Sequence, residues 1–295
     1  MTVETRPDQQ AAQPAPSLAG AAAGERPMES RRAAWAGFAR RLWDVVPAVA
    51  LLAGLLLLWQ WYASRPQNDP QFLPTPLAVW SALAAQREIL WHHTLVTLWE
   101  TVVGFAAALV AGVVCAVIVD ISPWLRRAVY PLLVASQTIP IITLAPLLVL
   151  WFGFGLTSKA IVILLVCFFP ITVALADGLR SADPELMRLY RTFGAGAGRI
   201  FWMVRLPGAL PQLFSGIRIA ITYSVIGAIF AEYVGASEGL GYYILLKQHS
   251  FATAGVMAAI VVTAALSIAL FALTALVERA ALPWYYLGRR EGSGN

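Results

Sequence analysis

The chain has 295 residues, of which 59% are hydrophobic and only 13% are charged, and its formal net charge is +5. A soluble domain carries about 25% charged residues, so this composition excludes a protein that faces water on all sides. It indicates an integral membrane protein, in which an excess of cytoplasmic Lys and Arg explains the positive charge more simply than a nucleic-acid partner would.

The N-terminal segment, residues 1–40, is rich in Ala, Pro, Gln, Glu and Arg and has no periodic apolar positions. This composition is typical of a disordered cytoplasmic tail. No apolar core with a small-residue cleavage site follows its start, so we do not expect a secretory signal. We expect a transmembrane domain over residues 41–284 and a short second cytoplasmic tail over residues 285–295.

Six segments are apolar over about 20 residues, the length that crosses a bilayer. In chain order they cover residues 45–63, 93–119, 128–152, 158–176, 213–234 and 252–276. The third segment contains Pro131, Pro140 and Pro146, so we expect it to be kinked. The sequence therefore predicts an all-α membrane protein with six transmembrane helices.

Residues 76–86, between the first two segments, predict a short helix. Pro76 stands near its start, and Leu77, Trp80 and Leu83 are spaced to share one face. Such a helix is expected to lie at the membrane interface.

The residue types that carry enzyme or metal chemistry do not form a recognisable set. Cys115 and Cys167 lie inside apolar runs and are expected to be buried without a disulfide. His92 and His93 are expected as interfacial residues at an outer membrane edge, far in sequence from His249, so we expect no metal site. The chain has no G-x-x-x-x-G-K-[ST] motif, so we expect it to bind no ATP phosphates itself.

Positively charged residues are distributed unevenly between the two sides that six spans define. With the N-terminus in the cytoplasm, sixteen of the 21 Lys and Arg residues lie inside, many in the N-terminal tail and in the loop over residues 177–212. Four lie outside, and one, Arg218, lies near the inner end of the fifth span, where it can snorkel. The positive-inside rule therefore predicts a multi-pass membrane protein with both termini in the cytoplasm.

The loop over residues 177–212 carries clear helix signals. Asp183 is a favourable N-cap, Pro184 suits the first helical position, and the carboxylate of Glu185 suits the helix dipole. Gly194 is expected to end this helix in a left-handed conformation.

A second short helix is expected over residues 198–204 of the same loop, ended by Pro207. The two patterns together predict a small helix-turn-helix that projects from the membrane. A loop that only connects two spans would need just a few residues, and this alternative stays open on composition alone.

The loop also carries the residues of a family motif. Nine residues separate Gly194 from Val204, which is followed by Leu206 and Pro207. The pattern resembles the cytoplasmic loop of membrane permeases of binding-protein-dependent ABC importers, where Glu-Ala-Ala, three residues, Gly, nine residues and Ile-x-Leu-Pro follow one another. The Glu-Ala-Ala positions hold Arg-Leu-Tyr over residues 188–190 here, so the acidic residue is lost, and Glu185 could substitute for it. The resemblance covers about residues 72–284.

The resemblance implies a place in the bacterial plasma membrane and names the partners of the chain. The loop would dock in a groove of a separate cytoplasmic ABC ATPase, which holds ATP and Mg²⁺, so no cofactor is expected on this chain. A second permease copy, expected to be identical, would complete the path, and an extracytoplasmic binding protein would deliver the substrate. The ATPase-coupling residues expected from it are Glu185, Leu189, Tyr190, Phe193, Gly194, Val204, Leu206 and Pro207.

Other segments resemble one branch of that family, which moves nitrate, taurine, aliphatic sulfonates and thiamine-pyrimidine precursors. They cover residues 72–76, 138–146, 151–155, 169–170, 206–211, 216–218, 231–232 and 239–241. Residues 136–140 and 232–237 look most like permeases for pyrimidine or riboflavin-type vitamin precursors. The implied function is inward passage of a small polar solute of this kind.

Polar residues within or near the predicted spans are candidates for the substrate path: Glu100, Gln137, Thr138, Tyr223 and Glu232. A carboxylate at the bilayer centre costs on the order of 3 kcal/mol, so the two glutamates should face a cavity or a partner. They either line the path or form a structural pair or helix end, and the sequence leaves both readings open.

Two other function classes remain as alternatives. A secondary transporter or channel would need ion-coupling carboxylates at mid-membrane and usually repeated halves, and no internal repeat is evident. A membrane-embedded enzyme would need a catalytic cluster, which the sequence does not offer.

Overall fold

The computed structural model describes residues 46–285, so the predicted tail over residues 1–40 and nearly all of the one over 285–295 lie outside the described residues. The described residues divide between two units, 46–58 and 59–285. The described part of the first unit is helical, within the apolar helix Val46–Ala63 that continues into the second. The side chains of this part are exposed.

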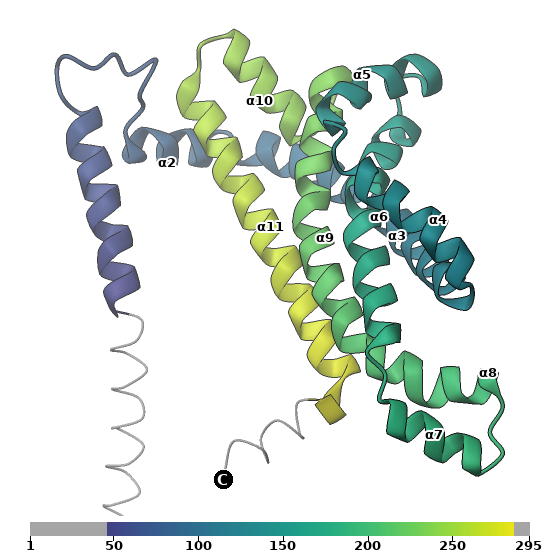
Figure 1. Ribbon diagram of the computed structural model, residues 1–295. Coiled ribbons are helices and arrows are strands. Elements are labelled where there is room, and N and C mark those ends of the chain that lie inside the picture. Colours follow the sequence, from purple (N-terminus) through teal and green to yellow (C-terminus); the bar gives the residue numbers. More distant parts are fainter. Residues whose placement is uncertain (1–45, 286–295) are drawn as a thin grey trace, which may run out of the picture. The chain divides into compact units, whose positions relative to one another are not determined.

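The second unit is built from helices (Figure 1). They are α2 (Pro76–Ala85), α3 (Arg87–Ile121), α4 (Pro123–Ser136), α5 (Ile141–Phe152), α6 (Leu156–Arg180), α7 (Pro184–Thr192), α8 (Ala197–Ile200), α9 (Leu206–Gly235), α10 (Leu240–His249) and α11 (Thr253–Ala281). A five-residue π-helical turn, Phe201–Arg205, joins α8 to α9. Within residues 46–285 the fold is all-α, as the sequence predicts.

The apolar helices agree with five of the six predicted spans. Their bounds are Val46–Ala63, Arg87–Ile121, Leu156–Arg180, Ala197–Gly235 and Thr253–Ala281. The third predicted span is instead a pair of helices, α4 and α5, bent by 98°. Counting this pair as one span gives six.

The break between α4 and α5 follows from proline chemistry. Pro140 has no N–H to donate, and its backbone (φ −65°, ψ 110°) is extended at the position preceding α5. The preceding turn over residues 137–139 carries the change of direction. Pro131 and Pro146 lie inside α4 and α5, which continue past them. The expected kink is therefore confirmed at Pro140, and it is a complete break.

The centre of the second unit is a tight contact of α3, α6 and α9. Its buried residues include Ala108, Ile163, Ile171 and Ala220, with Cys167 buried as expected. Glycine allows the helices to approach, because a Cβ at Gly104 would lie 2.6 Å from Ile163 Cβ. This use of small residues is typical of membrane helix packing.

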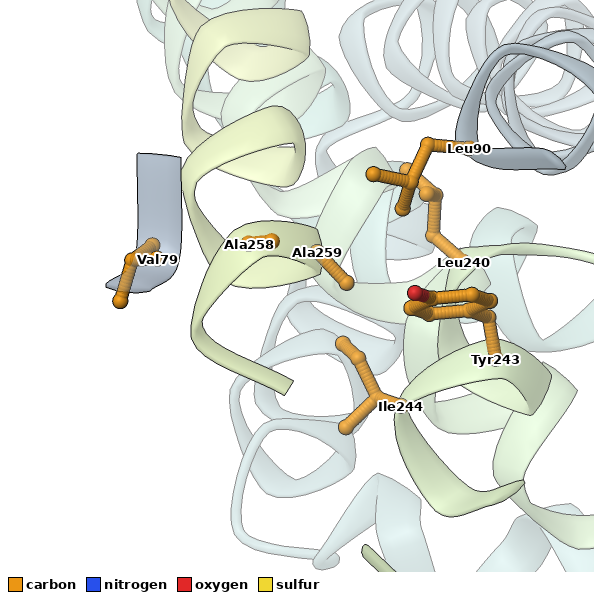
Figure 2. Packing of buried hydrophobic residues seen from close by; sticks show 7 residues of the cluster. All are labelled: Val79, Leu90, Leu240, Tyr243, Ile244, Ala258 and Ala259. Atoms are coloured by element: carbon orange, nitrogen blue, oxygen red, sulfur yellow. The ribbon is translucent and has the colours of Figure 1, made fainter. Parts of the chain in front are cut away.

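A second core joins α2, α3, α10 and α11 at the opposite end of the bundle from α7 and α8 (Figure 1). Figure 2 shows its residues: Val79, Leu90, Leu240, Tyr243, Ile244, Ala258 and Ala259. The Tyr243 hydroxyl donates to Gln86 Oε1 over 2.5 Å. Burial raises the pKa of this phenol, which keeps the donating proton in place. Helix α10 was not predicted, because its ten residues are too few to span a membrane and show no clear periodicity.

Candidate coupling loop and buried polar network

The first half of the loop between α6 and α9 has the geometry that its sequence predicts. Asp183 Oδ1 accepts hydrogen bonds from the backbone N–H groups of Glu185, at 2.8 Å, and Leu186, at 3.4 Å. Pro184 is the first residue of α7, and Glu185 lies in its first turn. The N-terminal signals of the helix are therefore confirmed.

Gly194 ends this half in the left-handed region, with φ of +77°. Its N–H donates to the carbonyl of Arg191 at 2.9 Å, and the next N–H, from Ala195, donates to the carbonyl of Tyr190 at 3.0 Å. These bonds satisfy carbonyl groups that the end of α7 would otherwise leave open. The predicted left-handed conformation is confirmed.

The second half of the loop differs from the prediction at its end. Helix α8 (Ala197–Ile200) passes through the π-helical turn into α9 without a break, so the whole segment Ala197–Gly235 is one helical run of 39 residues. Pro207 was expected to end a helix, and this was wrong. It is the second residue of α9, directly after the π-helical turn Phe201–Arg205, and the helical run continues past it.

Two predicted coupling residues expose apolar side chains on the loop. Phe193 is 77% exposed and Leu189 is 50% exposed, while Tyr190 is half-buried. Trp202 is 69% exposed and Met203 is also exposed. Sequence reasoning missed these two residues, because they stand in an apolar run that resembles a buried segment. We group these exposed apolar side chains, Leu189, Phe193, Trp202 and Met203, as the docking surface, named for the role that the sequence analysis expects of this loop.

The other predicted coupling residues hold the loop to the bundle. Val204 is buried, and Leu206 packs against a core of α3, α6 and α9 residues that includes Ala116, Leu175 and Ala209. The motif therefore divides into residues that face outward and residues that fix the loop in place.

Arg205, which the sequence analysis did not single out, provides the strongest attachment. Its Nη2 lies 2.7 Å from Asp120 Oδ1, near the end of α3. The same guanidinium donates to the carbonyl of Leu179 in the last turn of α6, from Nη2 at 2.9 Å and from Nε at 3.2 Å. One side chain thus ties the loop to two membrane helices through charge-assisted bonds. Asp120, an acidic residue directly after the predicted span over residues 93–119, was the sequence signal that could have indicated such a partner.

Glu232 is 1% exposed and its carboxylate is satisfied inside the chain. Its Oε1 accepts from the Thr97 hydroxyl at 2.6 Å, and its Oε2 accepts from the N–H of Gly241 at 2.5 Å. The N–H of Leu240 donates to the Thr97 oxygen at 2.8 Å. The carboxylate therefore caps the start of α10, where unpaired N–H groups need acceptors.

His93 completes this arrangement. It was expected at an interfacial position, but it is buried, and its Nδ1 accepts from the N–H of Gly239 at 3.0 Å. Gly239 has φ of +114°, and a Cβ there would lie 2.2 Å from the Glu232 carboxyl carbon. We call His93, Thr97, Glu232 and the backbone of residues 239–241 the α10 latch.

Glu100 lies beside this latch and forms a buried ion pair. Its Oε1 is 2.5 Å from Lys159 Nζ, near the start of α6, and both side chains are about nine-tenths buried. Glu100 lies on α3 one turn after Thr97, which belongs to the α10 latch. The structure therefore brings together two of the five candidate path residues, with a lysine that the sequence analysis did not include.

The three remaining path candidates lie elsewhere and are exposed. Gln137 and Thr138 occupy the break between α4 and α5, where the Thr138 hydroxyl donates to the carbonyl of Ala135 at 2.7 Å. Tyr223 lines a cavity of about 450 Å³ together with residues of α9 and α11. Arg218, beside this cavity, is paired with Glu278 of α11 at 3.2 Å.

Comparison with solved structures supports this fold. The chain is similar to the MetNI methionine ABC transporter in an inward-facing conformation, with a TM-score of 0.58 and 21% identity over 66% of this chain and 97% of that one. It is also similar to an amino acid ABC transporter, with a TM-score of 0.56 and 13% identity over 67% of this chain and 96% of that one.

Sequence comparison gives more similar relatives. A probable ABC transporter permease protein of Haemophilus influenzae is 38% identical over 74% of this chain and 89% of its own length. The formylaminopyrimidine transport permease protein ThiX of Halalkalibacterium halodurans is 37% identical over 83% of this chain and 98% of its own length. The riboflavin transport system permease protein RibX of Chloroflexus aurantiacus is 34% identical over 82% and 91%.

The family model described as binding-protein-dependent transport system inner membrane component matches residues 108–282, which include α6, the loop and α9. The match covers more than half of the chain and contains Arg205, Gly194 and the docking surface. The chain therefore belongs to the family of binding-protein-dependent transport system inner membrane components, the permease subunits of ABC importers.

Proposed function

We propose that the loop from Asp183 to Pro207 is the surface through which this permease receives the work of ATP hydrolysis from a separate cytoplasmic ATPase. The observation that supports this most is the docking surface, where large apolar side chains stand exposed on a loop held by Arg205. An exposed apolar group on a firmly held element is typical of an interface anchor. ATP and Mg²⁺ would bind on the ATPase, and the permease would hold no cofactor.

The proposed orientation places this loop and both termini in the cytoplasm. The arginines of the loop support it through the positive-inside rule. The permease would act as a pair of identical chains and would receive its substrate from an extracytoplasmic binding protein, as importers of this family do.

The proposed substrate is a small polar nitrogen heterocycle of the vitamin-precursor type. Two relatives above 30% identity are named for formylaminopyrimidine and riboflavin transport. Relatives named for taurine and for aliphatic sulfonates, from Escherichia coli, are 29% and 30% identical. The greater similarity to the first group supports the heterocycle.

The coupling proposal is tested by truncating the docking surface. In Phe193→Ala and Trp202→Ala, the ATPase co-purifying with the full-length permease should fall, because each interface anchor contributes about 2 kcal/mol. Phe72→Ala is the matched control, since Phe72 is equally exposed, at 73%, on the segment before α2. Unchanged ATPase retention and uptake in both loop variants would contradict the proposal.

The substrate proposal needs a separate measurement. Uptake of radiolabelled formylaminopyrimidine and of taurine should be compared in cells with and without this chain, together with its binding protein and ATPase. We expect uptake of the heterocycle to depend on the chain. If only taurine uptake depends on the chain, taurine replaces the heterocycle as the proposed substrate, and the coupling proposal is unaffected.

A further inference from the structure

Three arginines of two different helices line one cavity at the loop end of the bundle. The cavity measures about 600 Å³ and lies between the first half of α4 and the end of α6. Arg126 and Arg127 come from α4 and Arg180 from α6, and Tyr130 lines the same space. The distribution of charge along the sequence explains why arginines occur at this end, but it does not require them to share a cavity.

The charges in this cavity are only partly compensated. Among residues 46–285, the one carboxylate within 4.0 Å of these guanidinium groups is Asp177, whose Oδ1 lies 4.0 Å from Arg180 Nη1. Both of those side chains are about half exposed, so their mutual attraction is weak. Arg126 and Arg127 therefore leave an excess of positive charge that favours an anion.

The donor groups suit phosphate. A planar guanidinium matches two phosphate oxygens at once, and a phenol hydroxyl can add a further hydrogen bond. Trp124, two residues before Arg126, is largely exposed, as is Leu132 on the later part of α4. An exposed tryptophan between basic and apolar residues is typical of the membrane interface, where basic pockets between membrane helices bind anionic head groups.

We propose that the cavity of Arg126, Arg127 and Arg180 is a binding site for a phosphate group, supplied by the head group of an anionic phospholipid. The site is separate from the docking surface and from the α10 latch, so this inference goes beyond the transport function. An occupied site would join α4, the first half of the broken helix pair, to the end of α6, beside the attachment of Arg205 at Leu179.

The test measures phosphatidylglycerol binding to the full-length chain in mild detergent by native mass spectrometry. Arg126→Gln with Arg127→Gln should raise the apparent Kd about thirtyfold, at about 1 kcal/mol for each arginine. Arg279→Gln is the matched control, because Arg279 is exposed near the end of α11 and does not line the cavity. It should change the Kd by less than about twofold. If the double variant is not recovered, Arg127→Gln alone carries the comparison, since that side chain is exposed.

A second arm separates a lipid from a soluble source. Millimolar inorganic phosphate is added without lipid, and the thermal unfolding midpoint is measured. The phosphate site would have a soluble ligand if phosphate raises the midpoint of the wild type but not of the double variant, while both chains bind phosphatidylglycerol equally. Equal binding of lipid and of phosphate by wild type and double variant would overturn the proposal, and so would an equal loss in Arg279→Gln.

Discussion

At the scale of single residues, the sequence left open whether the buried glutamates line a substrate path or stabilise the fold. Glu232 could have lined a substrate path or served a helix end, and it accepts hydrogen bonds from Thr97 and from the backbone of Gly241. A backbone donor cannot be read from side-chain letters, so the sequence could identify the glutamate but not its partners. The partners lie 135 and 9 residues away.

We expect Glu232→Ala to lower the stability of the membrane domain. The change leaves the N–H of Gly241 without its acceptor, and an unsatisfied buried donor costs about 1–3 kcal/mol. The thermal unfolding midpoint in detergent measures the effect. Glu238→Ala is the control, because the Glu238 side chain is 55% exposed and the His92 Nε2 atom lies 3.6 Å from its Oε2. A normal midpoint with lost uptake would assign Glu232 to the path instead.

The ion pair of Glu100 and Lys159 permits a double-mutant test. Lys159→Met should destabilise the chain by about 3–5 kcal/mol, because it leaves a carboxylate buried without its cation. Glu100→Leu in the same chain should recover most of that loss, since neither charge then remains. The unfolding midpoints of both single variants and the double variant are compared. Additive losses would show that the two side chains do not stabilise each other.

At the scale of elements, helix ends could be predicted where the capping residues are close to the helix in sequence. The caps at Asp183 and Gly194 were predicted and are confirmed. Pro207 was misread because a proline can either end a helix or occupy its first turn. The choice depends on the π-helical turn before it, which has no sequence signature. Helix α10 was not predicted because its ten residues show no clear periodicity, and its capping groups, which come from α3 and α9, are distant in sequence.

The turn at Gly194 should tolerate no β-branched residue. A Cβ there has no atom within 4 Å, so φ of +77° is the sole source of strain. Gly194→Val should cost about 1–2 kcal/mol locally and turn α7 away from α8, which lowers ATPase retention in pull-down. Gly196→Val is the control, because Gly196 has equally open space and φ of −71°. Equal retention in the two variants would show that the turn does not position the docking surface.

At the scale of the whole molecule, the apolar segments identified the fold class, while the arrangement of the helices depends on contacts that the sequence does not display. Gly104 and Ile163 illustrate this, since their close approach is evident only once α3 and α6 are paired. The distribution of arginines predicts the orientation of the bundle, and that prediction remains to be measured.

We expect the loop to be accessible only from the cytoplasm. A single cysteine at Ala195, in a chain with Cys115→Ala and Cys167→Ala, should not react with an impermeant maleimide in intact cells and should react after the membrane is opened. A cysteine at Phe72 should show the opposite pattern. Labelling of the Ala195 cysteine from outside would reverse the proposed orientation.

The unbroken run from Ala197 to Gly235 has a mechanical consequence. At 1.5 Å per residue it is about 58 Å long, which is nearly twice the thickness of about 30 Å of the hydrocarbon core of a bilayer. Near the loop, Arg205 attaches this helical run to Asp120 of α3. Near the other end, Glu232 accepts a hydrogen bond from the N–H of Gly241 in α10. The run has two irregular features, the π-helical turn and Pro211, and both lie near the loop. We therefore expect a displacement of the loop to be transmitted along α9 to α10, because the irregular stretches of this helical run are confined to its loop end.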